Sequence, residues 1–188
     1  MEGEKVVHNP LANTILGCSM PPIVKMLKKG IQIAISIDGS GSSDDQNILA
    51  AARLASQYQK AYHKDVILLT AQQVLEMITV IPAEILKLNA GSLDVGKDAD
   101  FIVIDITRPN LVPIRVDNVV ENLIWSSNRS EVRWVIANRK ILKDDYKIIT
   151  LDEDEDEIKN DLQHISEFLI KYKKMCPEIR ASGVRQVK

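Results

Sequence analysis

The first ninety residues alternate short apolar runs with segments in which apolar residues recur at helical spacing. Strands are predicted at Lys5–Val7 and Ile31–Ile37, and helices near 21–29 and 46–62. In Ile31–Ile37 small or polar residues separate the apolar ones, as expected of a strand that helices cover. This βαβα order is typical of a parallel sheet, so the pattern predicts an α/β fold.

A longer helical pattern begins at Thr70, a suitable N-cap, and continues to Leu88. Pro82 interrupts it, because proline lacks an N–H and clashes with the preceding turn. One kinked helix and two abutting helices both remain open.

Short strands and turns are predicted from Gly91 onward. The strands are Phe101–Asp105, Val119–Trp125, Val132–Ala137 and Lys140–Leu142. Asn138 and Arg139 join the last two as a hairpin. A type I′ turn there requires a positive φ at Arg139, which costs about 1 kcal/mol for a residue with a Cβ. We therefore expect this turn to be rebuilt.

The last segment predicts an amphipathic helix. It begins with the acidic run Asp152–Glu157, where the helix dipole favours negative charge. One face then carries Ile158, Leu162, Ile165, Phe168, Leu169 and Tyr172. The polar tail from Pro177 is expected to fray.

Composition narrows the function classes. The formal net charge of −2 and a pI near 5.9 offer no basic face for nucleic acid. No run reaches the roughly 20 apolar residues of a membrane span, and the start has no signal-peptide pattern. The two cysteines, Cys18 and Cys176, have neither disulfide-framework nor zinc-site spacing. The expectation is a cytoplasmic protein with reduced thiols that binds neither nucleic acid nor membrane.

The candidate functional residues lie where the two predicted strands end. Ligands of parallel α/β sheets bind at the carboxyl ends of strands, so His8 and Asp38 belong to one rim. A carboxylate there can bind Zn²⁺ and accept a proton from metal-bound water. The alternatives are an ordinary Asp-Gly turn at Asp38 and a loop histidine bonded to backbone at His8. His63 and His164 are interpreted as surface residues.

The ordered set Val6–Asn13, Ser19–Gly30 and Ile37–Gly39 resembles the last two barrel strands of the amidohydrolase superfamily. The most similar branches are the methylthioadenosine/S-adenosylhomocysteine deaminases, guanine deaminases and triazine chlorohydrolases. Gly91–Asp105 is similar to the segment by which these enzymes return to their β-sandwich. The resemblance, over residues 5–150, implies the last two βα units of a metal-dependent (β/α)8 barrel at 1–90. It also implies part of a small β-sandwich domain at 91–150, followed by a C-terminal helix and tail at 151–188.

The resemblance also implies roles for three residues. Asp38 matches the aspartate that binds the catalytic metal and moves the proton between water and leaving ammonia. His8 matches a residue near the substrate, and Asn13 lies in the same motif, so both are expected to bind substrate. The implied cofactor is a divalent metal, zinc first, with iron or manganese as alternatives. The implied substrate is a small amino-substituted heterocycle.

The family's His-x-His motif and its further metal-binding histidines have no counterpart in this chain. One carboxylate cannot hold a catalytic zinc, and the first strand, almost at Met1, has no preceding element to pair with. We therefore expect a fragment that is completed by an N-terminal half or by homo-oligomerisation. An alternative is a non-catalytic module for oligomerisation or partner binding. A third hypothesis joins His8, Asp38 and His63 across copies into a new metal site.

Overall fold

The computed structural model describes residues 3–149 and 155–175. The chain divides into two compact units, Met1–Lys147 and Ile148–Lys188. The first is an α/β fold, which confirms the predicted class. The second contains helix α8 (Glu155–Met175), which confirms the predicted amphipathic helix, although Asp152–Asp154 of its expected acidic start lie outside the described residues. The expected division near residue 90 stays a prediction.

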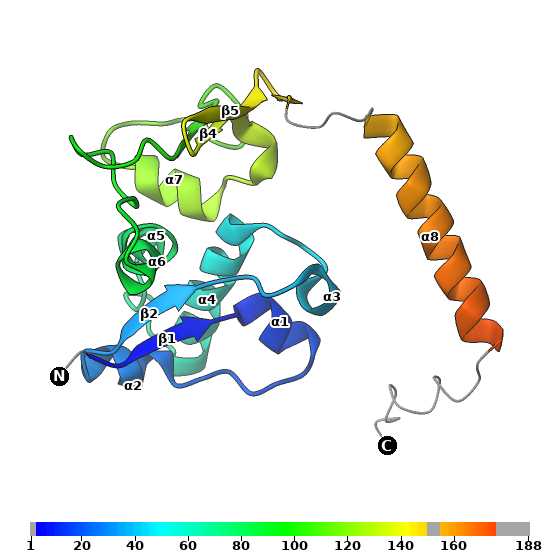
Figure 1. Cartoon of the computed structure of the whole chain (residues 1–188). Coiled ribbons are helices and arrows are strands. Elements are labelled where there is room, and N and C mark those ends of the chain that lie inside the picture. The colour runs from blue at the N-terminus through cyan, green and yellow to red at the C-terminus, as the bar shows by residue number, and fades with distance from the viewer. Residues whose placement is uncertain (1–2, 150–154, 176–188) are drawn as a thin grey trace. The chain divides into compact units, whose positions relative to one another are not determined.

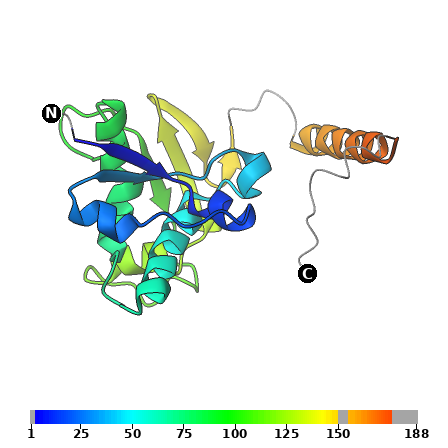
Figure 2. The same ribbon diagram turned by 90° about the horizontal axis from the view of Figure 1, so that it is seen from below.

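The first unit begins with two parallel strands. β1 (Lys5–His8) pairs with β2 (Gln32–Ile35), and His8 lies opposite Ile35. All of Ile33–Ile35 is buried, as expected of a parallel strand with both faces covered. Helices α1 and α3 lie beyond the arrowheads of the two strands (Figure 1), and the strands cross over α5 and α6 (Figure 2).

Six helices connect and cover these strands. They are α1 (Pro10–Ile15), α2 (Ile23–Lys28), α3 (Ser40–Ser43), α4 (Ile48–His63), α5 (Ala71–Ile78) and α6 (Val80–Leu86). The side chain of Asn47 caps α4, and Thr70 and Gln73 form a capping box at the start of α5. The helix is interrupted at Thr79, so the segment from Ala71 to Leu86 forms two abutting helices and Pro82 lies in the first turn of the second.

One apolar core joins β2 to the helices. Its buried members are Ile23, Ile33, Ile35, Leu49, Ala51, Ala52, Ala55, Leu69, Ala71, Val74, Met77 and Ile124. The buried alanines of α4 are small, so neighbouring elements can pack closely against this helix. Val74 and Met77 are three residues apart and lie on the same buried face of α5. Burial of this apolar area is the main force that holds the strands against the helices.

A second sheet has the order β3-β4-β5-β6, built from β3 (Phe101–Ile104), β4 (Val132–Ala137), β5 (Lys140–Asp144) and β6 (Lys147–Ile148). β3 with β4 and β4 with β5 pair antiparallel. The expected rebuilding of the β4–β5 turn is wrong, because Asn138 and Arg139 both keep positive φ, at 49° and 60°. Asn138 N–H also donates to Asp100 Oδ1 at 2.7 Å, which holds the turn against the chain before β3.

The strand predicted at Val119–Trp125 is wrong: this segment is helix α7. Val120, Leu123 and Ile124 share one helical face and pack into the core, with Ile124 fully buried. Arg53 of α4 donates to the carbonyl oxygen of Ile124 at 2.8 Å. Packing against α4 and α5 therefore overrides the β-propensity of the two valines. No helix in the described part of the chain is long and apolar enough to cross a membrane.

Candidate active site

His8 ends β1 with a buried, unpaired imidazole. The side chain is 2% exposed, and neither Nδ1 nor Nε2 has a hydrogen-bond partner. The buried Oδ1 of Asn9 also lacks a partner. Burial lowers the pKa of His8 to about 4, because desolvation penalises the imidazolium. At neutral pH the ring is uncharged, so one nitrogen can donate a hydrogen bond and the other can accept one.

The position of His8 follows from the local sequence. Side chains alternate along β1, so His8 shares the face of Val6, which packs on the core, whereas Val7 is exposed on the opposite face. Pro10 then begins α1 directly, as proline favours a first helical position. The ring thus lies on the side of β1 that faces the core.

Asp38 lies three residues beyond the end of β2 and is exposed. Its φ is 66°, and its Oδ1 accepts a hydrogen bond of 2.7 Å from Gly39 N–H. The Asp38 carbonyl accepts from Gln46 Nε2 at 3.4 Å, which links the residue to the start of α4. Its carboxylate therefore sits on a defined turn and remains open to a ligand.

His8 and Asp38 come from the same edge of the sheet. Ser36 N–H donates to the His8 carbonyl oxygen at 2.9 Å, one step beyond the last pair of the parallel ladder. Asn13 is half-buried on α1, the helix that begins two residues after His8. The three expected site residues thus belong to segments that leave the carboxyl ends of β1 and β2.

The stretch after Asp38, Gly39–Ser43, contains the short helix α3. Buried Ser43 donates to the Gly39 carbonyl oxygen at 3.1 Å, so its hydroxyl holds this turn together. Pattern reasoning did not foresee the buried groups of Asn9 and Ser43. Their only signal was their proximity in sequence to His8 and Asp38.

The described residues do not fit a complete metal site. Residues 3–149 and 155–175 contain no group of three His, Cys, Asp or Glu side chains that could hold an ion. A catalytic zinc requires three protein ligands, and Asp38 offers one. His63 is the last residue of α4, roughly 22 Å along that helix from the end that lies near Asp38.

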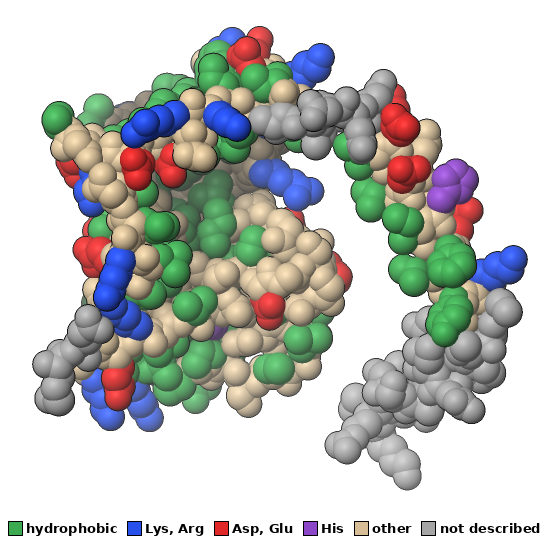
Figure 3. All heavy atoms as spheres, in the orientation of Figure 1, with side chains coloured by type: hydrophobic (Ala, Val, Ile, Leu, Met, Phe, Trp, Pro, Cys, Tyr) green, Lys and Arg blue, Asp and Glu red, His purple; other side chains and the backbone are tan. Residues whose placement is uncertain are grey.

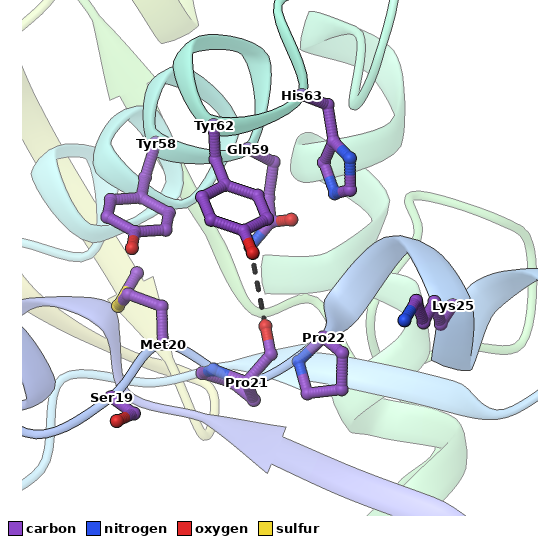
Figure 4. A pocket seen from close by; sticks show the side chains of 9 residues that line it. All are labelled: Ser19, Met20, Pro21, Pro22, Lys25, Tyr58, Gln59, Tyr62 and His63. Carbon is purple, nitrogen blue, oxygen red and sulfur yellow. Dashed lines mark hydrogen bonds between the residues drawn. The ribbon is translucent and has the colours of Figure 1, made fainter.

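His63 instead lines a cavity of about 330 Å³ between the end of α4 and the loop that precedes α2 (Figure 4). Tyr58 and Tyr62 stack there with ring centroids 6.1 Å apart. Gln59 Nε2 donates to the Pro21 carbonyl oxygen at 3.5 Å. The Gln59 bond therefore joins α4 to the loop, whereas the tyrosine stack lies within α4 itself.

Comparison with known proteins places the chain in a family. The model of the amidohydrolase family matches residues 1–150. The 5'-deoxyadenosine deaminase of Methanosarcina acetivorans is 36% identical over 149 residues, which are 79% of this chain and 34% of that protein. A 5-methylthioadenosine/S-adenosylhomocysteine deaminase of Syntrophus aciditrophicus is 33% identical over 156 residues, which are 82% and 35% of the two chains.

A solved structure agrees with these relatives. The adenosine deaminase of Xanthomonas campestris with bound zinc has a TM-score of 0.81 and 25% identity, over 89% of this chain and 38% of that one. This chain spans about a third of the length of the two deaminases matched in sequence. Because the family model covers most of its residues, the chain belongs to the amidohydrolase family.

Proposed function

We propose that this chain is the C-terminal portion of a metal-dependent aminohydrolase that cleaves a non-peptide C–N bond of a small amino-substituted ring. Family membership supports the reaction class. The names of the relatives support a purine-like substrate such as a deoxyadenosine, and a triazine-like ring is the alternative within the same class. The rest of the enzyme comes from outside this chain, which spans 34% of the Methanosarcina relative.

The observation that carries the proposal is the shared position of His8 and Asp38. His8 is the last residue of β1 and Asp38 follows the carboxyl end of β2, and the 2.9 Å bond from Ser36 N–H to the His8 carbonyl oxygen ties these two strand ends together. Barrel enzymes build their active sites at this end of the strands. We assign β1 and β2 to the last two strands of a (β/α)8 barrel, and residues 91–150 to part of a β-sandwich domain.

Asp38 is assigned as one metal ligand. Its carboxylate is exposed on a fixed turn, and the other ligands must come from segments beyond this chain because the described residues supply no cluster. Zinc is the preferred ion, since the similar adenosine deaminase binds zinc. Iron and manganese are the alternatives, because they can bind the same kinds of ligand.

His8 and Asn13 are assigned to the substrate. A neutral imidazole can donate from one nitrogen and accept at the other, so one of them can bond a ring nitrogen or an amino group of an aminopurine. Burying these nitrogens without partners costs about 1–3 kcal/mol, so a bound polar group stabilises the site. In the complete enzyme, His8→Gln should raise KM for the ring substrate more than it lowers kcat. Alternatively, a polar group from a neighbouring strand of the complete barrel bonds the imidazole in place of the substrate. In that case His8→Gln would leave KM unchanged.

The test is complementation. This chain is co-purified with the part of the Methanosarcina acetivorans deaminase that lies outside its match to this chain, and ammonia release from 5'-deoxyadenosine is measured with zinc present. We expect activity from the pair and none from either part alone. Asp38→Asn should lower kcat/KM by about 1,000-fold or more.

Asp44→Asn is the matched control, because Asp44 is also exposed, also has a positive φ of 56°, and lies in the same loop. It should retain activity. A zinc-loaded pair without activity, or an Asp38→Asn pair as active as the unaltered one, would count against the proposal.

A second candidate is a non-catalytic association module. Val7 on β1 is 58% exposed, and an apolar cavity of about 590 Å³ opens between β3, β4 and the helices α5 and α7. Such surfaces favour association with another chain. In this case the chain would bind its complementing part, while Asp38→Asn would change neither binding nor any activity.

A further inference from the structure

The cavity of about 330 Å³ at the C-terminal end of α4 has the volume of a small-molecule site. It lies between α4 and the loop that leads into α2. The turn that holds Asp38 is linked to the other end of α4, so the proposed reaction does not use this cavity. Its lining residues therefore need an explanation of their own.

The charged groups at the cavity are basic. Of the described residues, nine line it; Lys25 and His63 are among them, and none of the nine is acidic. Lys25 forms no ion pair with any residue of 3–149 or 155–175. Figure 3 shows basic side chains over α2 at the lower left of the view, and this helix contains Lys25 and Lys28. This charge favours an anionic ligand.

Gln59 brings a buried polar group to the cavity. Its side chain is 2% exposed, and its Nε2 donates to the Pro21 carbonyl oxygen at 3.5 Å. Within the part of the chain that the structure describes, no group donates to its Oε1. In Figure 4 this oxygen points toward the side of the cavity where His63 lies. A ligand with an N–H or O–H group would satisfy it.

The opposite side of the cavity is aromatic. Tyr58 and Tyr62 stack there with ring centroids 6.1 Å apart, and Met20 lies on the same side (Figure 4). Tyr62 is 71% exposed, so a ligand can reach its ring. Tyr58 and His63 are five residues apart, which is about 7.5 Å along α4. The cavity thus offers aromatic rings, a hydrogen-bond acceptor and basic groups in that order.

We propose that this cavity binds a nucleoside monophosphate. The base lies against Tyr58 and Tyr62, since bases stack on aromatic rings. A ribose hydroxyl, between base and phosphate, donates to Gln59 Oε1. The phosphate accepts from Lys25 and His63. These two donors belong to different helices, and the three terminal oxygens of a phosphate point in different directions, whereas the two of a carboxylate lie in one plane.

The experiment titrates the isotope-labelled full chain with AMP, and NMR chemical-shift changes locate the site. We expect saturable shifts at residues 18–25 and 58–63. Adenosine lacks the phosphate and ribose 5-phosphate lacks the base. Each should bind about 10-fold or more weakly than AMP, because each loses one set of contacts.

Two variants test the two ends of the cavity. Lys25→Glu should weaken AMP binding by about 10-fold or more, and Tyr62→Leu by about 5-fold. Both side chains are exposed, so neither change disturbs the core. Lys28→Glu is the matched control, because it makes the same charge change on α2 and Lys28 does not line this cavity. It should change the affinity by less than about 2-fold.

Each other outcome overturns the proposal. No saturable shifts up to about 5 mM AMP mean that the cavity does not take this ligand. Ribose 5-phosphate as tight as AMP means that the tyrosines bind no base, and adenosine as tight as AMP means that the basic groups bind no phosphate. Equal losses in the Lys25 and Lys28 variants indicate general charge attraction. Shifts that disappear in His8→Gln place the nucleotide at the ends of β1 and β2 instead.

Discussion

The main-chain carbonyl of His8 accepts a 2.9 Å hydrogen bond from Ser36, which ties the end of β1 to the residue that follows β2. Asp38 comes two residues later and turns the chain with a φ of 66°. The two ionisable side chains at this edge have opposite environments, because His8 is buried and Asp38 is exposed. Desolvation therefore lowers the pKa of His8, whereas the Asp38 carboxylate is exposed to solvent.

Burial of His8 makes stability depend on pH. Its pKa falls from 6.5 to about 4 in the folded chain, so between these values the unfolded chain binds a proton that the folded chain does not. Stability is fully present above pH 6.5 and is lost as pH falls through this window. From pH 7 to pH 5, the free energy of unfolding should fall by about 2 kcal/mol more than in His8→Gln.

Urea unfolding at the two pH values measures this difference. His63→Gln is the control, because His63 is an exposed histidine at the end of α4 and should behave as the unaltered chain does. Equal pH dependence of the His8→Gln variant and the unaltered chain contradicts the prediction.

The isolated chain should not retain a metal ion. The described residues offer no three-ligand cluster, and one carboxylate binds zinc too weakly to survive dialysis. Elemental mass spectrometry after dialysis at neutral pH should find fewer than about 0.1 zinc, iron or manganese ions per chain. About one ion per chain would instead support a site joined from His8, Asp38 and His63 across copies.

Glycine at position 139 should stabilise the β4–β5 hairpin. Arg139 has a φ of 60°, a conformation that costs a residue with a Cβ about 1 kcal/mol. Arg139→Gly should therefore raise the free energy of unfolding by about 1 kcal/mol in urea titrations. Lys140→Gly, one residue into β5, serves as the control and should lower it. Destabilisation by both changes would show that the Arg139 side chain matters more than its backbone.

Gly91 and Gly96 form a matched pair after α6. Their φ values are +91° and +89°, but a Cβ at Gly91 would lie 2.8 Å from Ala83 Cβ, whereas one at Gly96 meets nothing within 4 Å. Alanine costs conformational energy at both positions and steric repulsion at Gly91 alone. Gly91→Ala should therefore lower the melting temperature more than Gly96→Ala does, by an amount that corresponds to about 1–2 kcal/mol in the free energy of unfolding. Equal losses would mean that α6 moves to accept the methyl group.

Local rules explain which elements could be predicted. Thr70 and Gln73 cap α5 through bonds between residues three apart, so the sequence alone shows where that helix begins. Val119–Trp125 was mispredicted because its valines suit a strand, while the helix depends on Ile124 reaching the core between α4 and α5. The Arg139 turn was mispredicted because pairing on both sides holds a conformation that the residue itself disfavours.

The candidate site divides in the same way. The sequence by itself determined the α/β class and placed the first two strands to within two residues of their ends, since these depend on periodicity and on neighbouring residues. Its family motif also proposes His8, Asn13 and Asp38 as site residues. Only the tertiary structure decided that His8 is buried with both nitrogens unpaired, while Asp38 stands exposed on a left-handed turn. Burial and hydrogen-bond partners depend on residues far apart in the chain, and no local pattern records those contacts.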